Sequence, residues 1–154
     1  LGLRQAAPLA SHVALYLNLC LPSVRPMGGA GPMFLEDQLL WIDASDVLLA
    51  FTFRRYSVAT ANAVKVFRQR GGKVVLITDA ASAPAAASAH HVLVARSSSA
   101  SPFDSYTAAF SVCNALLAAV AQRRRKELGA ALERGEDLWE SKWIRPANEG
   151  AANK

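Results

Sequence analysis

The chain has 154 residues, of which 52% are hydrophobic and 19% are charged, and its formal net charge is +5. This length predicts one domain that buries about two thirds of its unfolded surface, and this composition is that of a chain that folds. No apolar run reaches about 18 residues, which excludes a membrane-spanning helix. Four positive charges lie together at 123–126, near the end of a predicted helix and without interleaved aromatic residues, which argues against direct binding of nucleic acid.

Helical and strand patterns alternate along the chain. A helix is predicted from about Ala7 to Leu21, where Pro22 follows, and Val24–Met27 is a strand weakened by its proline. After a loop at 28–32, the pattern predicts a short helix at 34–41, a strand at 47–52 and a helix at 57–70, which ends at two glycines. Two further strands are predicted at 73–78 and 92–95, followed by a loop at 97–102. A long helix is predicted to run from about 104 past 121 to about 132.

The C-terminal part differs in character from the alternating part. An amphipathic piece covers 135–143, and 146–154 is expected to be a disordered tail. We therefore predict a domain at 1–132, followed by an amphipathic segment and flexible tail at 133–154. Because the chain begins with Leu1 rather than Met, we expect it to be part of a longer protein.

The fold class follows from the order and composition of the strands. Near-continuous apolar strands that alternate with helices are typical of a parallel sheet covered on both faces, so we predict an α/β three-layer sandwich. Ligands of such sheets bind beyond the carboxyl ends of the strands. Polar loops gather at this edge, at 2–6 if a strand precedes it, and at 52–57, 78–82 and 97–104.

Two arginines and several hydroxyls crowd the turn between the strand at 47–52 and the next helix. Such a turn offers free backbone N–H groups and the positive end of a helix dipole. Arg54 and Arg55 add a fork of donors that suits phosphate. The sequence therefore predicts a phosphate site here. The alternative is that Ser57 only caps the helix and the arginines are solvated.

Cys20 and Cys113 both lie in apolar helical contexts. Cysteines of this kind are typical of structural thiols in a reducing compartment. We therefore predict a cytoplasmic protein with no disulfide, no metal site and no cofactor.

Five short elements occur in an order that resembles the sugar isomerase (SIS) domain of RpiR-type bacterial transcriptional regulators. The resemblance covers about residues 2–125, and its elements are Ser45–Thr52, Phe51–Thr60 with its F-x-RYS-x-x-T pattern, Arg70–Asp79, Ala89–Leu93 and Pro102–Ser105. It implies a flavodoxin-like α/β fold that binds phosphorylated sugars and dimerises. In the full regulators DNA is bound by an upstream helix-turn-helix domain that this chain does not include.

The chain departs from the family pattern at several positions. Ala6 and Ala83 stand where family members carry serines, His90 stands at an aspartate position and Ser45 at a glycine position. Two hydroxyl donors are thus lost from the expected pocket. The family's first strand, which precedes Gly2, is also missing from this chain, and without it the strand at 24–27 loses its neighbour.

The turn residues and the resemblance together give one set of candidate ligand-binding residues, with no catalytic residue among them. The set is Gly2, Arg4, Thr52, Arg54, Arg55, Tyr56, Ser57, Thr78, Asp104 and Ser105.

Each candidate also has a purely structural interpretation. Thr52 is a β-branched strand residue, and Asp104 could cap the long helix. One arginine could pair with Asp79 or Asp104 instead of a ligand. Tyr56 could pack on the adjacent loop, and Thr78 with Asp79 could simply form a turn.

Three functions fit these observations. The first is a sugar-phosphate-sensing, dimerising effector domain of a regulator. The second is a dimerisation module that has lost its ligand, and the third is an aldose–ketose isomerase, for which the histidines are poorly placed as a base. Association as a homodimer or higher homo-oligomer is predicted independently from two apolar elements, the alanine-rich helix with Ala108, Val112, Ala115, Leu116, Ala119 and Val120, and the segment with Leu138, Trp139, Trp143 and Ile144.

Overall fold

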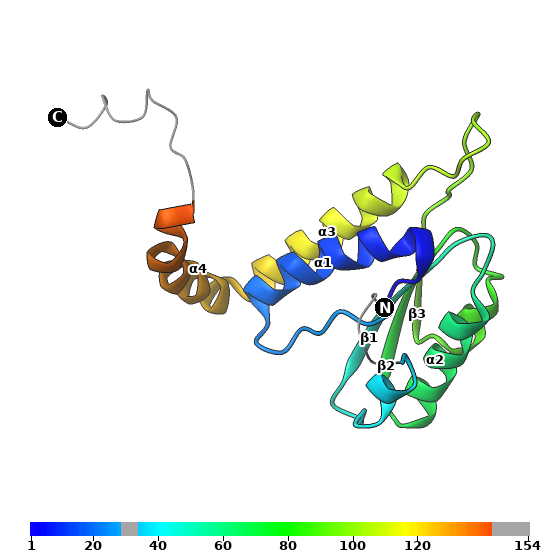
Figure 1. Cartoon of the computed structure of the whole chain (residues 1–154), viewed down its shortest axis with the longest axis horizontal. Coiled ribbons are helices and arrows are strands. Elements are labelled where there is room, and N and C mark those ends of the chain that lie inside the picture. Colours follow the sequence, from blue (N-terminus) through cyan, green and yellow to red (C-terminus); the bar gives the residue numbers. More distant parts are fainter. Residues whose placement is uncertain (29–33, 143–154) are drawn as a thin grey trace.

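The computed structural model describes residues 1–28 and 34–142. Its centre is a parallel sheet of β1 (Val47–Thr52), β2 (Lys73–Thr78) and β3 (His91–Val94), in the order β1-β2-β3. Helix α2 (Val58–Gln69) covers one face, and α1 (Ala7–Cys20) with α3 (Thr107–Arg123) covers the other (Figure 1). The predicted α/β three-layer sandwich is confirmed.

The two faces of the sheet belong to two separate hydrophobic cores. Side chains alternate along a strand, so Leu48 and Ala50 of β1 pack with α2, whereas Phe51 packs with α1 and α3. The same alternation sends Leu76 of β2 to the α2 side and Ile77 to the other. Because both faces are covered, the strands are apolar throughout their centres, which is the pattern that made them recognisable in the sequence.

Leu1 and Gly2 lie beside β1 as a short parallel neighbour. The Phe51 N–H donates to the Leu1 carbonyl at 2.9 Å, and the α-amino group of Leu1 donates to the Leu49 carbonyl at 2.8 Å. On its other side, the Gly2 N–H donates to the Met27 carbonyl at 3.4 Å. The segment Leu1–Gly2 therefore lies between β1 and Met27.

The predicted strand at Val24–Met27 was wrong, because this segment has no regular strand structure. A strand needs a neighbour that pairs along its length, and the described residues offer only Leu1 and Gly2. Pro26 also lacks the N–H that a ladder requires. The predicted helix at 34–41 is likewise reduced to a single 3-10 turn, η2 (Asp37–Leu39).

The long helix predicted to reach residue 132 is interrupted at Arg124, whose backbone leaves the helical region at φ −109° and ψ 29°. A new helix, α4 (Arg125–Trp139), follows and ends in a 3-10 turn, η4 (Glu140–Lys142). It leads away from the body of the molecule (Figure 1). The amphipathic piece thus begins at Arg125 and crosses residue 132, while Trp143, Ile144 and the predicted tail lie outside the described residues.

Within the described ranges, no helix has both the length and the apolar character that crossing a membrane requires.

When the 154-residue chain is prepared with Leu1 as its first residue, the α-amino group of Leu1 is buried and the stability of that chain should depend on pH. Burial lowers the pKa of this group from 8.0 to about 5. Between these pH values the unfolded chain holds a proton that the folded chain has released, so the free energy of unfolding should rise from about pH 5 to pH 8. Urea unfolding of the chain with a free Leu1 amino group, followed across this range, measures the rise.

The control is the same chain with its α-amino group acetylated, which removes the titration and leaves every histidine in place. The acetylated chain should show the smaller rise. Parallel pH profiles for the two forms would contradict the burial of the Leu1 amino group.

Candidate functional site

A narrow hollow opens at the carboxyl end of β1, where three parts of the chain meet. The 3-10 turn η1 (Arg4–Ala6), the loop that joins β1 to α2, and the start of α3 all line it. We call it the Thr60 hollow after its most buried polar residue, and its principal polar residues are Arg4, Thr52, Arg55, Ser57, Thr60 and Tyr106. The free space inside is about 20 Å³, which is enough for one water-sized group.

The loop between β1 and α2 is held at both ends. Phe53 is buried and its ring packs on Tyr106, with ring centroids 4.8 Å apart. Ser57 is the N-cap of α2, and its Oγ accepts a hydrogen bond from the Thr60 N–H at 3.3 Å. The capping role foreseen for Ser57 is therefore confirmed. The positive end of the α2 dipole lies at the same edge of the sheet as the hollow.

Two buried hydroxyls at the hollow have no hydrogen-bond partner in the described part of the chain. They are Thr60 Oγ1, on a residue that is 1% exposed, and Tyr106 Oη. A buried donor without a partner costs about 1–3 kcal/mol, so such atoms are rare in folded proteins and often mark a place for a ligand or water.

Neither residue is among the candidates predicted from the sequence. Thr60 had a signal, because it is the last residue of the pattern F-x-RYS-x-x-T and lies three residues after the helix cap. Tyr106 had none, since its place at the hollow depends on how α3 packs against a loop far away in the sequence.

The charges around the Thr60 hollow are positive. Arg4 and Arg55 are exposed at its wall, and none of the described residues that line it is acidic. Arg4 holds a left-handed backbone conformation with φ +53°, which costs a non-glycine residue about 1–2 kcal/mol. Strain of this kind is concentrated at binding sites.

Gly2 does not line the hollow, but it allows the chain to approach α1 closely. A Cβ atom at this position would lie 2.5 Å from the Ala6 carbonyl oxygen and 2.7 Å from the Ala10 Cβ. Only glycine fits there without a shift of the backbone. Gly2 thus positions η1, and with it Arg4, against the end of β1.

A second and wider hollow opens at the carboxyl ends of β2 and β3. We call it the Asp79 hollow; its space is about 440 Å³, and its polar residues are Arg54, Asp79, Arg96, Ser97, Ser98 and Asp104. Its two arginines and two aspartates balance in charge. The ion pair foreseen for one arginine is formed here, because Arg54 Nε lies 3.9 Å from Asp79 Oδ2.

Three remaining candidates, Thr78, Tyr56 and Ser105, do not line the Asp79 hollow but lie next to residues that do. Thr78 is fully buried, and its hydroxyl donates to Asp79 Oδ1 at 3.4 Å. Tyr56 lies beside the same carboxylate; burial and then Asp79 raise the pKa of this tyrosine, while Arg54 opposes them. Ser105 Oγ lies 3.2 Å from the Thr107 hydroxyl.

The capping role considered for Asp104 was wrong. Helix α3 begins at Thr107, its N-cap is Tyr106, and no side chain caps it. The helix starts later than the apolar pattern suggested, so Asp104 lies before the cap position. Asp104 lines the Asp79 hollow instead.

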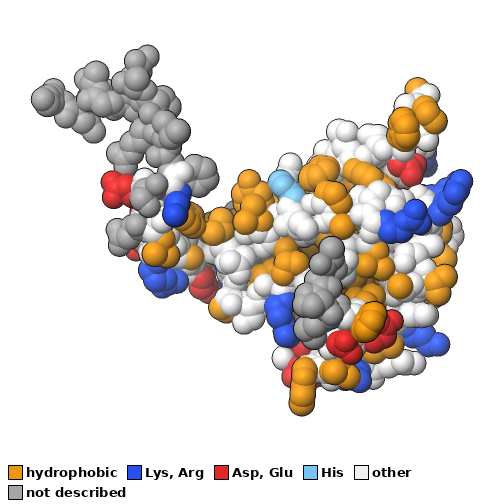
Figure 2. Space-filling model, viewed as in Figure 1, with side chains coloured by type: hydrophobic (Ala, Val, Ile, Leu, Met, Phe, Trp, Pro, Cys, Tyr) orange, Lys and Arg blue, Asp and Glu red, His pale blue; other side chains and the backbone are white. Residues whose placement is uncertain are grey.

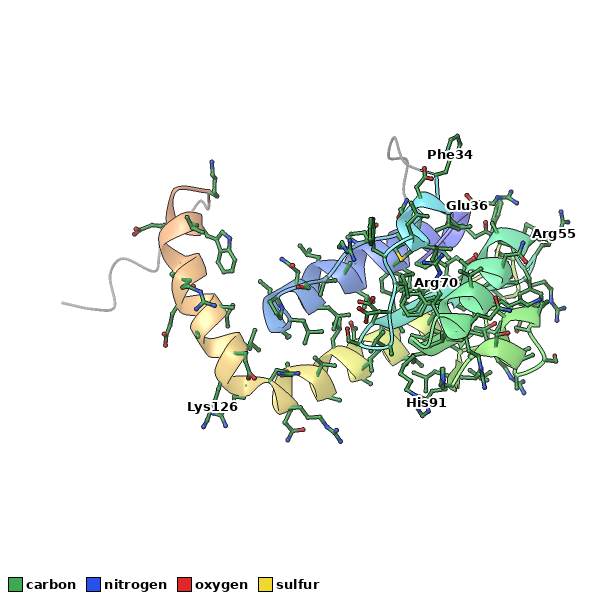
Figure 3. The ribbon with its side chains drawn as sticks, turned by 90° about the horizontal axis from the view of Figure 1, so that it is seen from below. Phe34, Glu36, Arg55, Arg70, His91 and Lys126 are labelled. Atoms are coloured by element: carbon green, nitrogen blue, oxygen red, sulfur yellow. The ribbon has the colours of Figure 1, made fainter. Side chains whose placement is uncertain are left out.

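The histidines and the basic cluster lie away from both hollows. His91 begins β3, at the end of the sheet opposite the hollows, and His90 Nδ1 accepts the Val74 N–H there at 3.0 Å. His12 packs edge-on against Tyr16 and Phe110 within the α1–α3 layer. Lys126 of the basic cluster lies at the other end of the molecule from Arg55 (Figure 3).

The fold of this chain is similar to the folds of two solved structures. The sugar isomerase domain of an RpiR transcription factor from Sphaerobacter thermophilus is 26% identical, with a TM-score of 0.81 over 88% of this chain and 75% of that one. The Vibrio vulnificus NanR protein, solved in complex with ManNAc-6P, is 12% identical, with a TM-score of 0.71 over 93% of this chain and 55% of that one. No curated protein matches the chain.

The resemblance inferred from the short sequence elements is therefore confirmed by the fold and by an independent sequence comparison. A family model described as "SIS domain" matches residues 1–119. The chain belongs to the SIS domain family.

Proposed function

We propose that the chain is the effector domain of a transcriptional regulator and that it senses a phosphorylated sugar, whose phosphate binds at the Thr60 hollow. The observation that carries this proposal is the buried Thr60 hydroxyl without a partner, in a hollow walled by Arg4 and Arg55. Its support from relatives is the sugar isomerase domain of an RpiR transcription factor and NanR in complex with ManNAc-6P.

The size of the hollow limits how the phosphate binds. Space for one water-sized group admits a single phosphate oxygen. The other oxygens would stay at the mouth, beside Arg55 and the N-terminus of α2. Ser57 can serve there without giving up its capping role, since its oxygen accepts from the Thr60 N–H while its own O–H remains free to donate.

The two serines lost from the family pattern do not weaken this site equally. Ala6 lines the Thr60 hollow, so a hydroxyl donor is absent where the phosphate would bind. Ala83 is buried and lines neither hollow. Only the alanine at position 6 therefore affects anion binding. The positive charge of Arg4 lies at the same hollow.

The sugar hydroxyls would occupy the Asp79 hollow. Its size falls within the range of ligand pockets, about 300–1,000 Å³, and its paired arginines and aspartates offer donors and acceptors with no net charge. Such a lining suits an uncharged polyol better than a second anion. In this arrangement Arg54 and Asp104 would contact the sugar, and Thr52 would contact the phosphate. Thr78 and Tyr56 would act through Asp79, beside which both lie, and Ser105 would act through Ser97, whose carbonyl accepts its N–H.

Sensing fits the structure better than isomerisation. An aldose–ketose isomerase needs a base beside the substrate carbonyl. Neither His12 nor His90 lines a hollow. Of the two carboxylates that line the Asp79 hollow, Asp79 is paired with Arg54 and Asp104 belongs to an exposed residue. We therefore propose a binding domain without catalytic residues.

We also propose that the domain forms a homodimer through its helical layer, and that DNA binding resides in an upstream domain. Hydrophobic side chains are exposed on the helices (Figure 2), both in the α1–α3 layer, where Leu15 is 65% exposed, and on α4, where Leu138 is 72% exposed. On α3 the alanines at 108, 115 and 119 are exposed as well. A second copy of the chain would cover these surfaces.

The first test of phosphate sensing compares Arg55→Ala and Thr60→Val with the wild type. A hydrogen bond to a charged group is worth about 1.5–3 kcal/mol, so each change should weaken the binding of a hexose 6-phosphate about tenfold or more. Thr60→Val should also leave the unliganded chain at least as stable, because the lost hydroxyl has no partner. Calorimetric titration with a panel that includes ManNAc-6P, together with thermal melting, measures both effects.

Lys65→Ala is the matched control, since it removes one positive charge from the exposed side of α2 and leaves the hollow intact. It should bind like the wild type. Equal affinity of Arg55→Ala and Lys65→Ala would contradict the site, and a well-folded wild type that binds no sugar phosphate would favour the ligand-free dimerisation module.

A second test uses the strained backbone of Arg4. Arg4→Ala removes the charge and keeps a side chain in the left-handed conformation, whereas Arg4→Gly removes both charge and strain. Both variants should bind sugar phosphate more weakly, while Arg4→Gly should be more stable than Arg4→Ala by about 1 kcal/mol. Denaturant unfolding and calorimetry check the two statements, and wild-type affinity in both variants would exclude Arg4 from the site.

The oligomeric state is tested by analytical ultracentrifugation. We expect the wild type to sediment as a dimer at micromolar concentration and Leu138→Glu to dissociate more readily, because a charge would enter the apolar surface. Leu40→Glu changes a similarly exposed leucine near η2 and should leave the dimer intact. A monomeric wild type would refute the dimer.

A further inference from the structure

We infer that Tyr106 donates a hydrogen bond from its hydroxyl to the anion in the Thr60 hollow, and that it thereby links occupancy of the hollow to the first turn of α3. The inference rests on the proposed phosphate site. It adds a ligand contact from a part of the chain that the sequence patterns did not identify, at the junction between the site and the helical layer.

The position of the Tyr106 side chain is fixed from two directions. Its ring packs on Phe53 of the site loop, at an interplanar angle of 58°. Its backbone is the N-cap of α3, and its carbonyl accepts the Phe110 N–H at 2.8 Å. The hydroxyl is therefore held at the hollow by the core on one side and by the helix on the other.

The Tyr106 hydroxyl has a proton that it could donate to a ligand. Tyr106 Oη is buried, and its proton has no acceptor among the described residues, although buried tyrosine hydroxyls usually find a partner. Burial, followed by the charge of Asp104 and more weakly that of Asp79, raises the pKa of Tyr106, while a hydrogen bond from the Gln5 side chain to the tyrosine oxygen opposes the rise. The tyrosine thus stays protonated at neutral pH and remains a donor.

One ligand oxygen can satisfy both unpartnered hydroxyls. Thr60 and Tyr106 line the same hollow, which has room for one water-sized group. Each hydroxyl carries one proton to donate, and a phosphate oxygen can accept two hydrogen bonds. Tyr106 would then supply, from the start of α3, the donor that Ala6 lacks on the wall of the same hollow.

Through this contact, ligand binding would affect the position of the helices. Helix α3 packs along α1 and touches α4, and these helices carry the exposed surface proposed for the dimer. A ligand that binds one arrangement of the α3 start better than another shifts the population toward that arrangement. Tyr106 is the residue through which such a preference would act.

The test is Tyr106→Phe, which removes only the hydroxyl and keeps the ring on Phe53. Calorimetric titrations with inorganic phosphate and with a hexose 6-phosphate should show binding about tenfold weaker than in the wild type. The unliganded variant should melt at nearly the same temperature as the wild type, since the Tyr106 hydroxyl donates no hydrogen bond in the unliganded chain. Tyr16→Phe, on an exposed residue of α1, is the matched control and should bind like the wild type.

Amide hydrogen exchange provides a readout that a merely structural role would not change. Ligand should slow exchange of the Phe110 amide in the wild type and have a smaller effect in Tyr106→Phe. Wild-type affinity in Tyr106→Phe would overturn the inference and assign the hydroxyl to a buried water, while the proposed function would stand. If the wild type itself bound neither probe, both would fall.

Discussion

The hydrogen bonds between Leu1 and β1 bring the two halves of the candidate site together. The Phe51 N–H and the Leu49 carbonyl hold Leu1 in register beside the strand, and the absence of a side chain on Gly2 lets the following turn lie against α1. Arg4 consequently faces the loop that carries Arg55, although the two residues are far apart in the sequence. Without this pairing the Thr60 hollow would lose one wall.

Three features that destabilise the folded chain lie at the same hollow. Arg4 holds a left-handed backbone conformation, and the hydroxyls of Thr60 and Tyr106 are buried without partners. Each feature costs on the order of 1–3 kcal/mol, and all three lie at one edge of the sheet. A concentration of unfavourable features in one place is typical of a site whose partner is a ligand rather than the protein itself.

The sequence predicted the parts of the fold that depend on local pattern. The apolar runs fixed β1 and β2, Ser57 marked the start of α2, and the glycines at 71 and 72 marked its end. It also brought Arg4, Thr52, Arg55 and Ser57 to one site, and the structure has all four at the Thr60 hollow.

The errors arose where distant contacts decide the structure. The segment Val24–Met27 has the composition of a strand but lacks a neighbour along its length. The break between α3 and α4 at Arg124 could not be predicted, because no proline or glycine lies at that position. Tyr106 could not be assigned to the site from the sequence, because its contact with Phe53 exists only once α3 is packed.

The most direct test of the account is a crystal structure of the chain grown with a hexose 6-phosphate. The account predicts a phosphate oxygen within about 3 Å of Thr60 Oγ1, with the remaining phosphate oxygens at Arg55 and the start of α2 and the sugar over the Asp79 hollow. A phosphate bound elsewhere, with only a water molecule in the Thr60 hollow, would contradict it.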